Sequence, residues 1–248
     1  MIKLTGKTAL VTGASGSIGR SSALALSRAG AQVLIHYKHS DQDAQSLVAE
    51  IRTGGGNAQK VCADLSRSDG LHGLARRVRA IVGHRLDILV MNAGIWKAGS
   101  LEDTTVEDFD ELMAVNVRAP YFLMQQLMPV MCKGTSVVLI SSLAARTSIG
   151  SLPAHAASKG AADALVRYFA AKLGPRDVRV NAIAPGIVET TPSIFTNSAE
   201  GREFTLGIQA LKRLAHPQDI ESAVVFLASE SARWITGATL RIDGGSRL

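Results

Sequence analysis

Short apolar runs alternate with helical segments along the whole chain. β-Branched and aliphatic residues fill the runs, which is typical of buried strands, and seven such runs stand at 8–12, 32–37, 58–63, 87–91, 137–140, 178–184 and 235–245, the last closing in a glycine turn. Helices are predicted between them at 20–29, 41–53, 106–131 and 153–173, with two more around 71–78 and up to 227. Strand and helix in alternation predict parallel strand pairing through right-handed crossovers.

This order of elements predicts an α/β fold. We expect a doubly wound, parallel, seven-stranded sheet between two layers of helices, a three-layer αβα arrangement. The 248 residues suffice for one sizeable core, and no change of composition marks a second domain. We therefore expect a single domain over 1–248, with a ligand bound beyond the carboxyl ends of the strands, at the switch point of the sheet.

A glycine-rich turn joins the first strand to the first helix. Its sequence is Thr12-Gly13-Ala14-Ser15-Gly16-Ser17-Ile18-Gly19. Glycines let a backbone turn sharply and approach a pyrophosphate, whose charge the amides of a helix N-terminus hold. Such a turn is weak evidence alone, but its position between strand and helix favours dinucleotide binding. The predicted cofactor-binding residues here are Gly13, Ser15, Gly16, Ser17, Ile18 and Gly19.

The end of the second strand carries basic and hydroxyl groups and no acid. It runs His36-Tyr37-Lys38-His39-Ser40, and the first carboxylate is Asp41. An acidic residue at this place takes the ribose hydroxyls of NAD. Basic side chains instead suit the 2′-phosphate of NADP. We therefore expect NADP(H), with NAD(H) as the alternative, held here by His36, Tyr37, Lys38 and Ser40.

Four polar residues form the candidate catalytic set. Ser142 follows the strand at 137–140, and His155 and Lys159 lie one helical turn apart on one face of the next helix. A hydroxyl facing an imidazole and an ammonium group suggests proton handling. Asn116 lies within the long helix beside Pro120, which predicts a kink whose freed backbone groups the asparagine satisfies.

The arrangement resembles the short-chain dehydrogenase/reductase family, in its shorter, single-domain branch. There, a serine at a strand end is followed thirteen residues later by the tyrosine of a Tyr-x-x-x-Lys motif. Ser142 and Lys159 match the serine and the lysine, whereas His155 occupies the tyrosine position. The resemblance covers essentially the whole chain. It implies a Rossmann-type fold and hydride transfer between a nicotinamide and a carbonyl/alcohol pair.

Further landmarks carry the remaining assignments that the resemblance implies. An aspartate after the third strand meets the adenine edge, an Asn-Ala-Gly triplet lies against the cofactor, and a Pro-Gly pair followed by threonine lies near the carboxamide. By its residue type alone, Asp64 would equally suit the N-cap of the following helix. The implied cofactor contacts are Asp64, Leu65, Asn92, Ala93, Gly94, Lys159, Pro185, Gly186, Ile187 and Thr190.

The chain departs from the family pattern at two positions. Ser17 replaces the middle glycine, so that the spacing of Gly13, Gly16 and Gly19 is that of the family's longer members. His155 is shorter than a tyrosine, and the ammonium of Lys159 one turn away lowers the pKa of its imidazole. A neutral imidazole is a poor proton donor. It serves alcohol oxidation as a base, or carbonyl reduction through a bridging water.

Three functions are open at this point. The one we favour is an NADP(H)-dependent oxidoreductase that interconverts a carbonyl and an alcohol on a small organic substrate, with an atypical Asn-Ser-His-Lys site. The second is reduction of an imine or an activated C=C bond. The third is a cofactor-binding protein without turnover, acting as a sensor or as an oligomer subunit. The tyrosines at 37, 121 and 168 fall elsewhere in the pattern and do not replace the missing one.

The substrate side is less clearly marked. Trp96 follows the fourth strand and is expected to form a pocket wall, so that Trp96, Ser142 and His155 are the predicted substrate contacts. The segment over about 187–212 is long for a loop, and such loops are commonly lids over a binding site. The resemblance implies a substrate lid there and a homotetramer built through the long helices.

Composition limits the partners. Net charge is +6, but basic residues are scattered apart from a cluster at 76–79, which favours a solvated helix face over a nucleic-acid site. No apolar run reaches the roughly 18 residues of a membrane span, and the N-terminus shows no leader pattern. Cys62 and Cys132 have no metal or disulfide spacing, which suits a reducing compartment. We expect a cytoplasmic protein with a small-molecule substrate and no metal.

Overall fold

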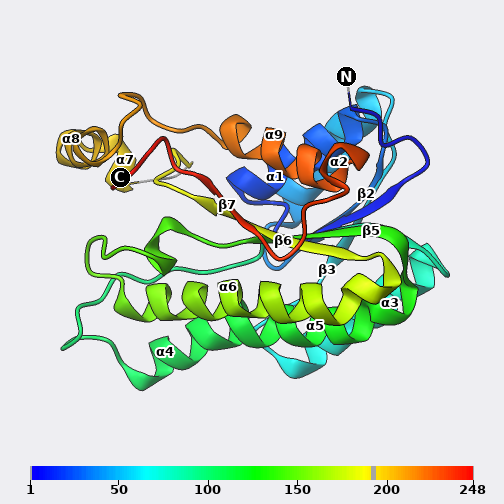
Figure 1. Ribbon diagram of the computed structural model, residues 1–248, viewed down its shortest axis with the longest axis horizontal. Coiled ribbons are helices and arrows are strands. Elements are labelled where there is room, and N and C mark those ends of the chain that lie inside the picture. The colour runs from blue at the N-terminus through cyan, green and yellow to red at the C-terminus, as the bar shows by residue number, and fades with distance from the viewer. Residues whose placement is uncertain (1, 191–193, 248) are drawn as a thin grey trace.

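The computed structural model describes residues 2–190 and 194–247 and shows seven parallel strands in one twisted sheet (Figure 1). Their spatial order is β3-β2-β1-β4-β5-β6-β7, so the direction of winding reverses between β1 and β4. This confirms the predicted doubly wound sheet. The strands are β1 (Thr8–Val11), β2 (Gln32–Tyr37), β3 (Ala58–Cys62), β4 (Leu86–Met91), β5 (Met131–Ile140), β6 (Arg179–Pro185) and β7 (Thr239–Ile242).

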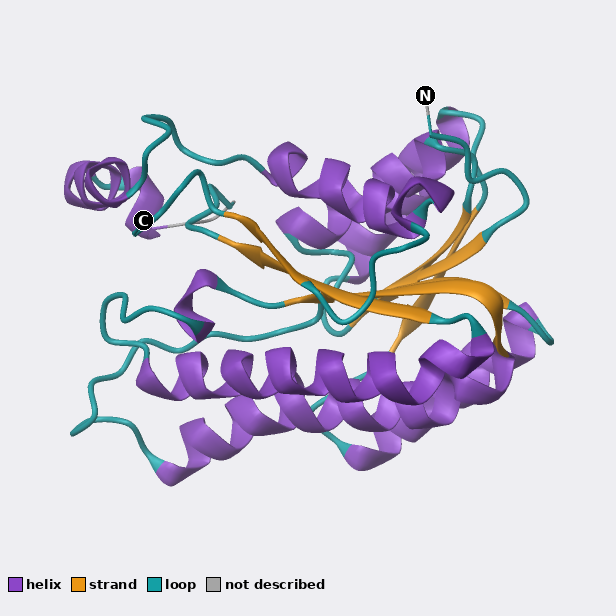
Figure 2. Cartoon of the chain, viewed as in Figure 1, coloured by secondary structure: helices purple, strands orange, loops and turns teal. Residues whose placement is uncertain are grey.

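Helices cover both faces of the sheet (Figure 2). One layer holds α1 (Ser17–Arg28), α2 (Asp41–Thr53) and α9 (Pro217–Ala228), and the other holds α3 (Ser68–Val82), α4 (Val106–Met113), α5 (Ala119–Leu127) and α6 (Pro153–Leu173). Alternate strand residues supply the two cores: Val11 packs in the first and Leu10 in the second. Among the described residues no helix is long and apolar enough to cross a membrane.

The long helix predicted over 106–131 is interrupted. A π-helical turn, Ala114–Arg118, joins α4 to α5, and a 3-10 turn ends the segment at Val130. Pro120 has no N–H to donate to the carbonyl four residues earlier, which is that of Asn116, and a widened turn absorbs the mismatch. The prediction was wrong at the far end, because β5 begins at Met131, well before the expected strand at 137–140.

The expected lid region contains regular structure. Residues 191–193 of the predicted 187–212 segment lie outside the described residues, and two helices follow, α7 (Ile194–Asn197) and α8 (Ala199–Ile208). They lie at the end of the molecule where β6 and β7 finish, next to the C-terminal segment (Figure 1). The amide of Arg247 donates to the Ile208 carbonyl at 2.8 Å, so the end of α8 is fastened to the last residues of the described chain.

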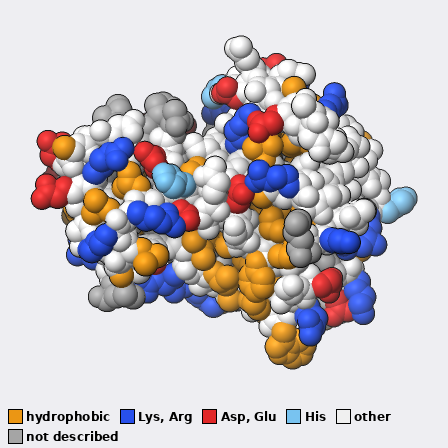
Figure 3. Space-filling view, turned by 90° about the horizontal axis from the view of Figure 1, so that it is seen from above, with side chains coloured by type: hydrophobic (Ala, Val, Ile, Leu, Met, Phe, Trp, Pro, Cys, Tyr) orange, Lys and Arg blue, Asp and Glu red, His pale blue; other side chains and the backbone are white. Residues whose placement is uncertain are grey.

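Charged side chains of both signs are dispersed over the surface. On the face seen in Figure 3, lysines and arginines stand among acidic residues and do not gather into one basic stripe. Across the described chain, cations are also ion-paired, among them Arg213 with Asp219 at 2.6 Å and Arg28 with Glu221 at 2.7 Å. The face therefore lacks the continuous basic track that marks a nucleic-acid groove.

Candidate active site

The glycine turn after β1 packs tightly against the end of β4. Asn92 donates from Nδ2 to the carbonyls of Thr12 and Gly13, each at 3.0 Å, and the amide of Ala93 donates to Thr12 Oγ1 at 3.0 Å. Gly13 has φ +63°, and a Cβ there would lie 2.9 Å from the Ala93 Cα. A Cβ on Gly19 would lie 2.3 Å from the Gly13 carbonyl. The turn is therefore restricted to glycine at both positions by its own packing.

The outer side of the turn is open. Gly16 is the N-cap of α1 and no side chain caps the first turn of that helix, while a Cβ on Gly16 would approach only the Gly13 carbonyl, at 3.5 Å. Gly13, Gly16, Ser17 and Ile18 line a large cavity. Backbone amides at an uncapped helix start that face a cavity suit a pyrophosphate. Ser15 and Gly19 belong to the turn but not to the cavity wall.

The His36 imidazole lies beneath this turn and is 2% exposed. The amide of Gly13 donates to Nδ1 at 3.0 Å, and the Ala63 carbonyl lies 3.1 Å from Nε2. Since a carbonyl only accepts, the proton is on Nε2. Burial lowers the pKa of His36 to about 4, so the ring is neutral near pH 7. His36 was expected to bind the 2′-phosphate; the structure corrects this, because its side chain is an uncharged support for the glycine turn.

The neighbouring Tyr37 and Asp41 are tied to each other. The Tyr37 hydroxyl donates to Asp41, and Lys60 Nζ lies 2.8 Å from both oxygens of that carboxylate. The hydrogen bond from Lys60, together with that from Tyr37, lowers the pKa of Asp41. The carboxylate of Asp41, the first after β2, is thus already hydrogen-bonded to Lys60 and Tyr37. Ser40 is exposed at the start of α2.

Lys38 and Asp64 follow the ends of β2 and β3 and pair with each other. Lys38 Nζ lies 3.1 Å from Asp64 Oδ1, and its side chain is 36% exposed. Asp64 also accepts from the amide and the hydroxyl of Ser66. It is not the N-cap of α3, which is Arg67, so that alternative was wrong. Leu65 is buried in the core below.

Asn116 lies in the π-helical turn, and both the oxygen and the nitrogen of its side-chain amide are hydrogen-bonded to protein groups. Its Oδ1 accepts from the Ile95 amide at 2.9 Å, and its Nδ2 donates to the Ile95 carbonyl and to Ser158 Oγ, each at 2.9 Å. Ser158 Oγ in turn donates to the His155 carbonyl at 2.7 Å. Asn116 therefore clamps the segment after β4 to the helix that carries His155.

Ser142 begins a short 3-10 turn directly after β5. Its Oγ accepts from the Ala144 amide at 3.1 Å, which uses a lone pair and leaves the hydroxyl hydrogen free to donate. The half-buried side chain lines the cavity. The hydroxyl of the preceding Ser141 is buried and has no hydrogen-bond partner among the described residues. Of the two serines, Ser142 is the one held in a defined orientation.

His155 and Lys159 lie on the buried face of α6, as predicted. His155 Nδ1 lies 3.3 Å from the Ile95 carbonyl, and Lys159 Nζ donates to the Ile140 carbonyl at 2.8 Å. Burial, and to a lesser degree the charge of Lys159, lowers the pKa of His155 to about 4. Burial lowers the pKa of Lys159 to about 8, partly offset by the charge of Asp163. The site therefore holds a neutral imidazole beside an ammonium group.

The tautomer of His155 follows from its partner. A carbonyl oxygen accepts but does not donate, so the single proton of the neutral ring is on Nδ1. Nε2 then carries a lone pair, and no protein group within the described chain is recorded as its hydrogen-bond partner. His155 lines the cavity. His155 therefore presents an acceptor to the cavity.

One cavity of about 1290 Å³ joins the glycine turn to Ser142, His155 and Lys159. It is lined by Pro185, Gly186, Ile187 and Thr190, for which cofactor contacts are predicted, and by Trp96, whose side chain is 66% exposed. Asn116 lies behind the wall. Apolar lining that the sequence analysis did not identify comes from Ile95, Ala98, Ile149, Leu152, Val188 and Phe204.

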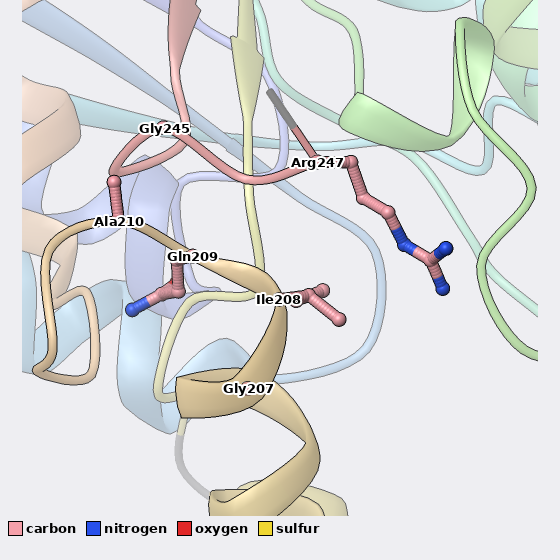
Figure 4. Close-up of a pocket in the computed structure, with 6 residues that line it drawn as sticks. All are labelled: Gly207, Ile208, Gln209, Ala210, Gly245 and Arg247. Atoms are coloured by element: carbon pink, nitrogen blue, oxygen red, sulfur yellow. The ribbon is translucent and has the colours of Figure 1, made fainter.

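A second hollow, of about 490 Å³, lies between the end of α8 and the C-terminal turn (Figure 4). Backbone forms most of its wall, and the side chains of Gln209 and Arg247 point away from each other. It contains none of the predicted catalytic residues. The larger cavity is therefore the candidate active site.

Ile95 is the functional residue that sequence reasoning missed. Its carbonyl accepts from both Asn116 and His155, so one peptide group orients the imidazole. Its contribution comes from the backbone, and no side-chain pattern in the sequence could have indicated it. Gly94 beside it is required small, since a Cβ there would lie 3.2 Å from both Asn116 Oδ1 and Lys159 Nζ.

Comparison with known proteins agrees with this geometry. The sequence profile of the family described as enoyl-(acyl carrier protein) reductase matches residues 13–247. Versicolorin reductase stcU of Emericella nidulans is 35% identical over 258 residues, covering 98% of this chain and 97% of the relative. Trihydroxynaphthalene reductase of Colletotrichum orbiculare is 34% identical over 257 residues, covering 98% and 90%.

Solved structures extend the likeness. The angucycline C-6 ketoreductase LanV with bound NADP superposes with a TM-score of 0.93 at 39% identity, covering 99% of this chain and 97% of that one. A second structure of LanV holds NADP and rabelomycin, with a TM-score of 0.89 at 38% identity, covering 99% and 98%. The chain belongs to the short-chain dehydrogenase/reductase family of NAD(P)-dependent oxidoreductases.

Proposed function

We propose that this protein is an NADP(H)-dependent oxidoreductase that interconverts a carbonyl and an alcohol on an apolar small molecule. The observation that carries the proposal is the single cavity that runs from the uncapped start of α1 to Ser142, His155 and Lys159. A nucleotide-binding element and a set of proton-handling groups share one apolar space. The NADP-bound relatives and their ketoreductase names support it.

The residues present fit such a cofactor. Amides at the uncapped start of α1 suit the pyrophosphate, and the open side of Gly16 leaves room for it. Lys38, with Ser40 nearby, would hold a 2′-phosphate, since its Nζ meets one oxygen of Asp64, whereas Lys60 bonds both oxygens of Asp41. The walls around Asn92 and Thr190 would hold the nicotinamide end. When bound, the cofactor supplies or accepts the hydride.

Ser142 and Lys159 would stabilise the reacting oxygen. The Ser142 hydroxyl, with its acceptor side already bonded to Ala144, donates to a carbonyl oxygen and continues to donate as that oxygen becomes an alkoxide. Lys159 uses one N–H on Ile140 and keeps two for other partners. Its ammonium lies in a buried setting, where its charge acts strongly on a developing negative oxygen.

His155 would take part in proton handling as an acceptor. In alcohol oxidation, the substrate hydroxyl gives its proton toward Nε2. In carbonyl reduction, a water between Nε2 and the substrate oxygen would donate a hydrogen bond to each. It would protonate the oxygen as the hydride arrives, and the hydroxide left behind would take a proton from the Lys159 ammonium. Asn116 acts here as a positioning residue, because it holds the Ile95 carbonyl that orients the ring.

A second candidate is reduction of an activated C=C bond or an imine. The matching profile carries an enoyl reductase description, and a hydride acceptor of this kind has less need of an acid at the oxygen. The third candidate is a binding protein without turnover, which gives no reason for Ser142, His155 and Lys159 to line one cavity.

We also propose one domain with a substrate lid around α7 and α8, a homotetramer and a cytoplasmic location.

NADPH consumption decides among these functions. We expect turnover with aryl and alicyclic ketones, and little with matched enones or cyclic imines. NADPH binding that saturates without turnover on any substrate would contradict the proposal and favour the binding protein. Turnover confined to enones or imines would favour the second candidate.

A further inference from the structure

The hydrogen-bond donors and acceptors at the end of the cavity near Ser142 and His155 can be counted group by group. Ser142 offers a hydroxyl hydrogen, because its lone pair is engaged by the Ala144 amide. His155 offers a lone pair at Nε2, because its N–H is engaged by the Ile95 carbonyl. Asn116 has both of its ends engaged and offers nothing. The pair that faces a reacting substrate is therefore the Ser142 donor and the Nε2 acceptor, and Lys159 adds two N–H donors beside them.

A plain ketone does not complement this pair. Its oxygen accepts from Ser142, but it has no hydrogen for Nε2, and the two sets of lone pairs repel each other. Nε2 is then left to a water or to nothing, and an unpaired acceptor in a buried site is costly. His155 is only 9% exposed, so bulk solvent does not readily relieve the loss.

We propose that the substrate of this site carries a hydroxyl group beside the reacting carbonyl, and that this hydroxyl donates to Nε2 of His155 while the carbonyl accepts from Ser142. The proposal rests on the carbonyl/alcohol function proposed above. The hydroxyl takes over the hydrogen bond that the bridging water makes to Nε2, while the Lys159 ammonium in the same cavity wall supplies the proton to the reduced oxygen. His155 is then a specificity-determining residue that selects hydroxy ketones, including phenolic and enolic ones.

The cavity indicates the rest of the molecule. Beyond the polar pair its lining is apolar, with Ile149 and Leu152 from the segment after Ser142 and Phe204 from α8. Such walls suit a flat or alicyclic hydrocarbon skeleton, and polar groups in it are best confined to the edge that meets Ser142 and His155. The expected class is therefore an apolar ring system with a carbonyl and a neighbouring hydroxyl.

The test uses five ketones of one skeleton with the intact protein and NADPH. They are 1-tetralone, 2-hydroxy-1-tetralone, 8-hydroxy-1-tetralone and the methyl ethers of the two hydroxylated compounds. For the wild type we expect kcat/KM for the better hydroxy ketone to exceed that for its ether and for 1-tetralone by about 10-fold or more, the worth of one buried hydrogen bond. The unsubstituted ketone controls for the bulk of the methyl group.

Two variants separate recognition from a merely structural role. His155→Phe removes the acceptor, and we expect it to reduce the preference for the hydroxyl to within about 2-fold. His155→Tyr replaces the acceptor by a donor, and we expect it to raise turnover of 1-tetralone and to abolish the preference. A residue that only filled space would alter all five substrates alike in both variants.

The outcomes distinguish this inference from the proposed function. If the wild type reduces hydroxy ketones, ethers and 1-tetralone equally, the carbonyl function stands and the inference is overturned. The inference is overturned as well if the preference survives in His155→Phe. If neither the wild type nor His155→Tyr consumes NADPH with any of the five ketones while both bind NADPH, the proposed function fails, and the inference falls with it.

Discussion

Two buried histidines, one beneath the glycine turn and one in the wall of the large cavity, do different things. His36 supports the glycine turn and His155 faces the cavity near Ser142, yet burial lowers the pKa of each imidazole to about 4. Their tautomers are opposite: His36 accepts at Nδ1, whereas His155 donates from Nδ1. His36 uses both nitrogens on backbone groups, and His155 uses one. The number of engaged nitrogens separates the structural histidine from the one for which we propose a role in the chemistry.

The comparison shows that a perturbed pKa alone does not locate chemistry. Desolvation produces the same shift under a packed turn and beside a cavity. What differs is whether an atom of the ring remains available to a ligand. The following predictions test that distinction, beginning with the largest expected effect.

Removing the Ser142 hydroxyl should cost the most. Ser142→Ala deletes the donor to the substrate oxygen, and we expect kcat to fall by about 10²–10³-fold with little change in NADPH affinity. Steady-state kinetics and a fluorescence titration of NADPH measure the two quantities. Ser141→Ala is the matched control, because that hydroxyl has no partner within the described chain, and it should leave the unfolding temperature unchanged. A parallel loss of NADPH binding in Ser142→Ala would contradict this assignment.

The stability of the fold should fall as the solution becomes acidic. The folded pKa of His36, about 4, lies below the unfolded value of about 6.5, so the unfolded chain takes up the proton first. The contribution is complete above pH 6.5 and is lost as the pH falls toward 4, by about 3 kcal/mol for this one ring. His155 acts in the same direction. Denaturant unfolding between pH 7 and 4 measures the slope.

The control for this slope is His36→Asn, whose amide does not titrate. Unfolding of that variant should depend less steeply on pH between 6.5 and 4 than unfolding of the wild type. Equal slopes would show that His36 is already protonated in the folded protein or that its ring does not govern acid stability.

Truncating His36 should weaken the fold and the cofactor together. His36→Ala leaves the Gly13 amide and the Ala63 carbonyl unpaired, and we expect a loss of about 2 kcal/mol in unfolding free energy. NADPH should bind more weakly, while kcat at saturating NADPH stays close to that of the wild type. Asparagine can still accept from Gly13, so His36→Asn should recover part of both losses. A fall in kcat alone would place His36 in the chemistry.

The smallest effect concerns cofactor choice. Lys38→Ala removes the accessible cation beside β2, and we expect KM for NADPH to rise about 10-fold while that for NADH is unchanged. Lys60→Ala is the comparison, because Lys60 bonds both oxygens of Asp41, whereas Lys38 meets only one oxygen of Asp64. Equal effects of Lys38→Ala on both cofactors would show that the 2′-phosphate binds elsewhere.

The sequence predicted the sheet well because strand and helix patterns are local. The spacing from Ser142 to Lys159 likewise placed both residues at the cavity correctly, since a strand end and an i, i+4 pair have definite geometry. His36 was misjudged, because its burial depends on how the glycine turn folds over β2. The role of Ile95 was invisible, because it acts through its peptide group. A lid was predicted over 187–212, but the weak patterning of that segment indicated neither α8 within it nor Phe204 as a lining residue.

The most direct test of the account is the protonation state of each imidazole. Histidine labelled with ¹⁵N in the intact protein reports by NMR which ring nitrogen carries the proton, and His155→Phe and His36→Asn assign the signals. We predict that at pH 7 His155 is protonated on Nδ1 alone and His36 on Nε2 alone, both neutral down to about pH 5. A proton on Nε2 of His155, or a charged ring there at pH 7, would contradict the acceptor role and restore a proton donor to the site.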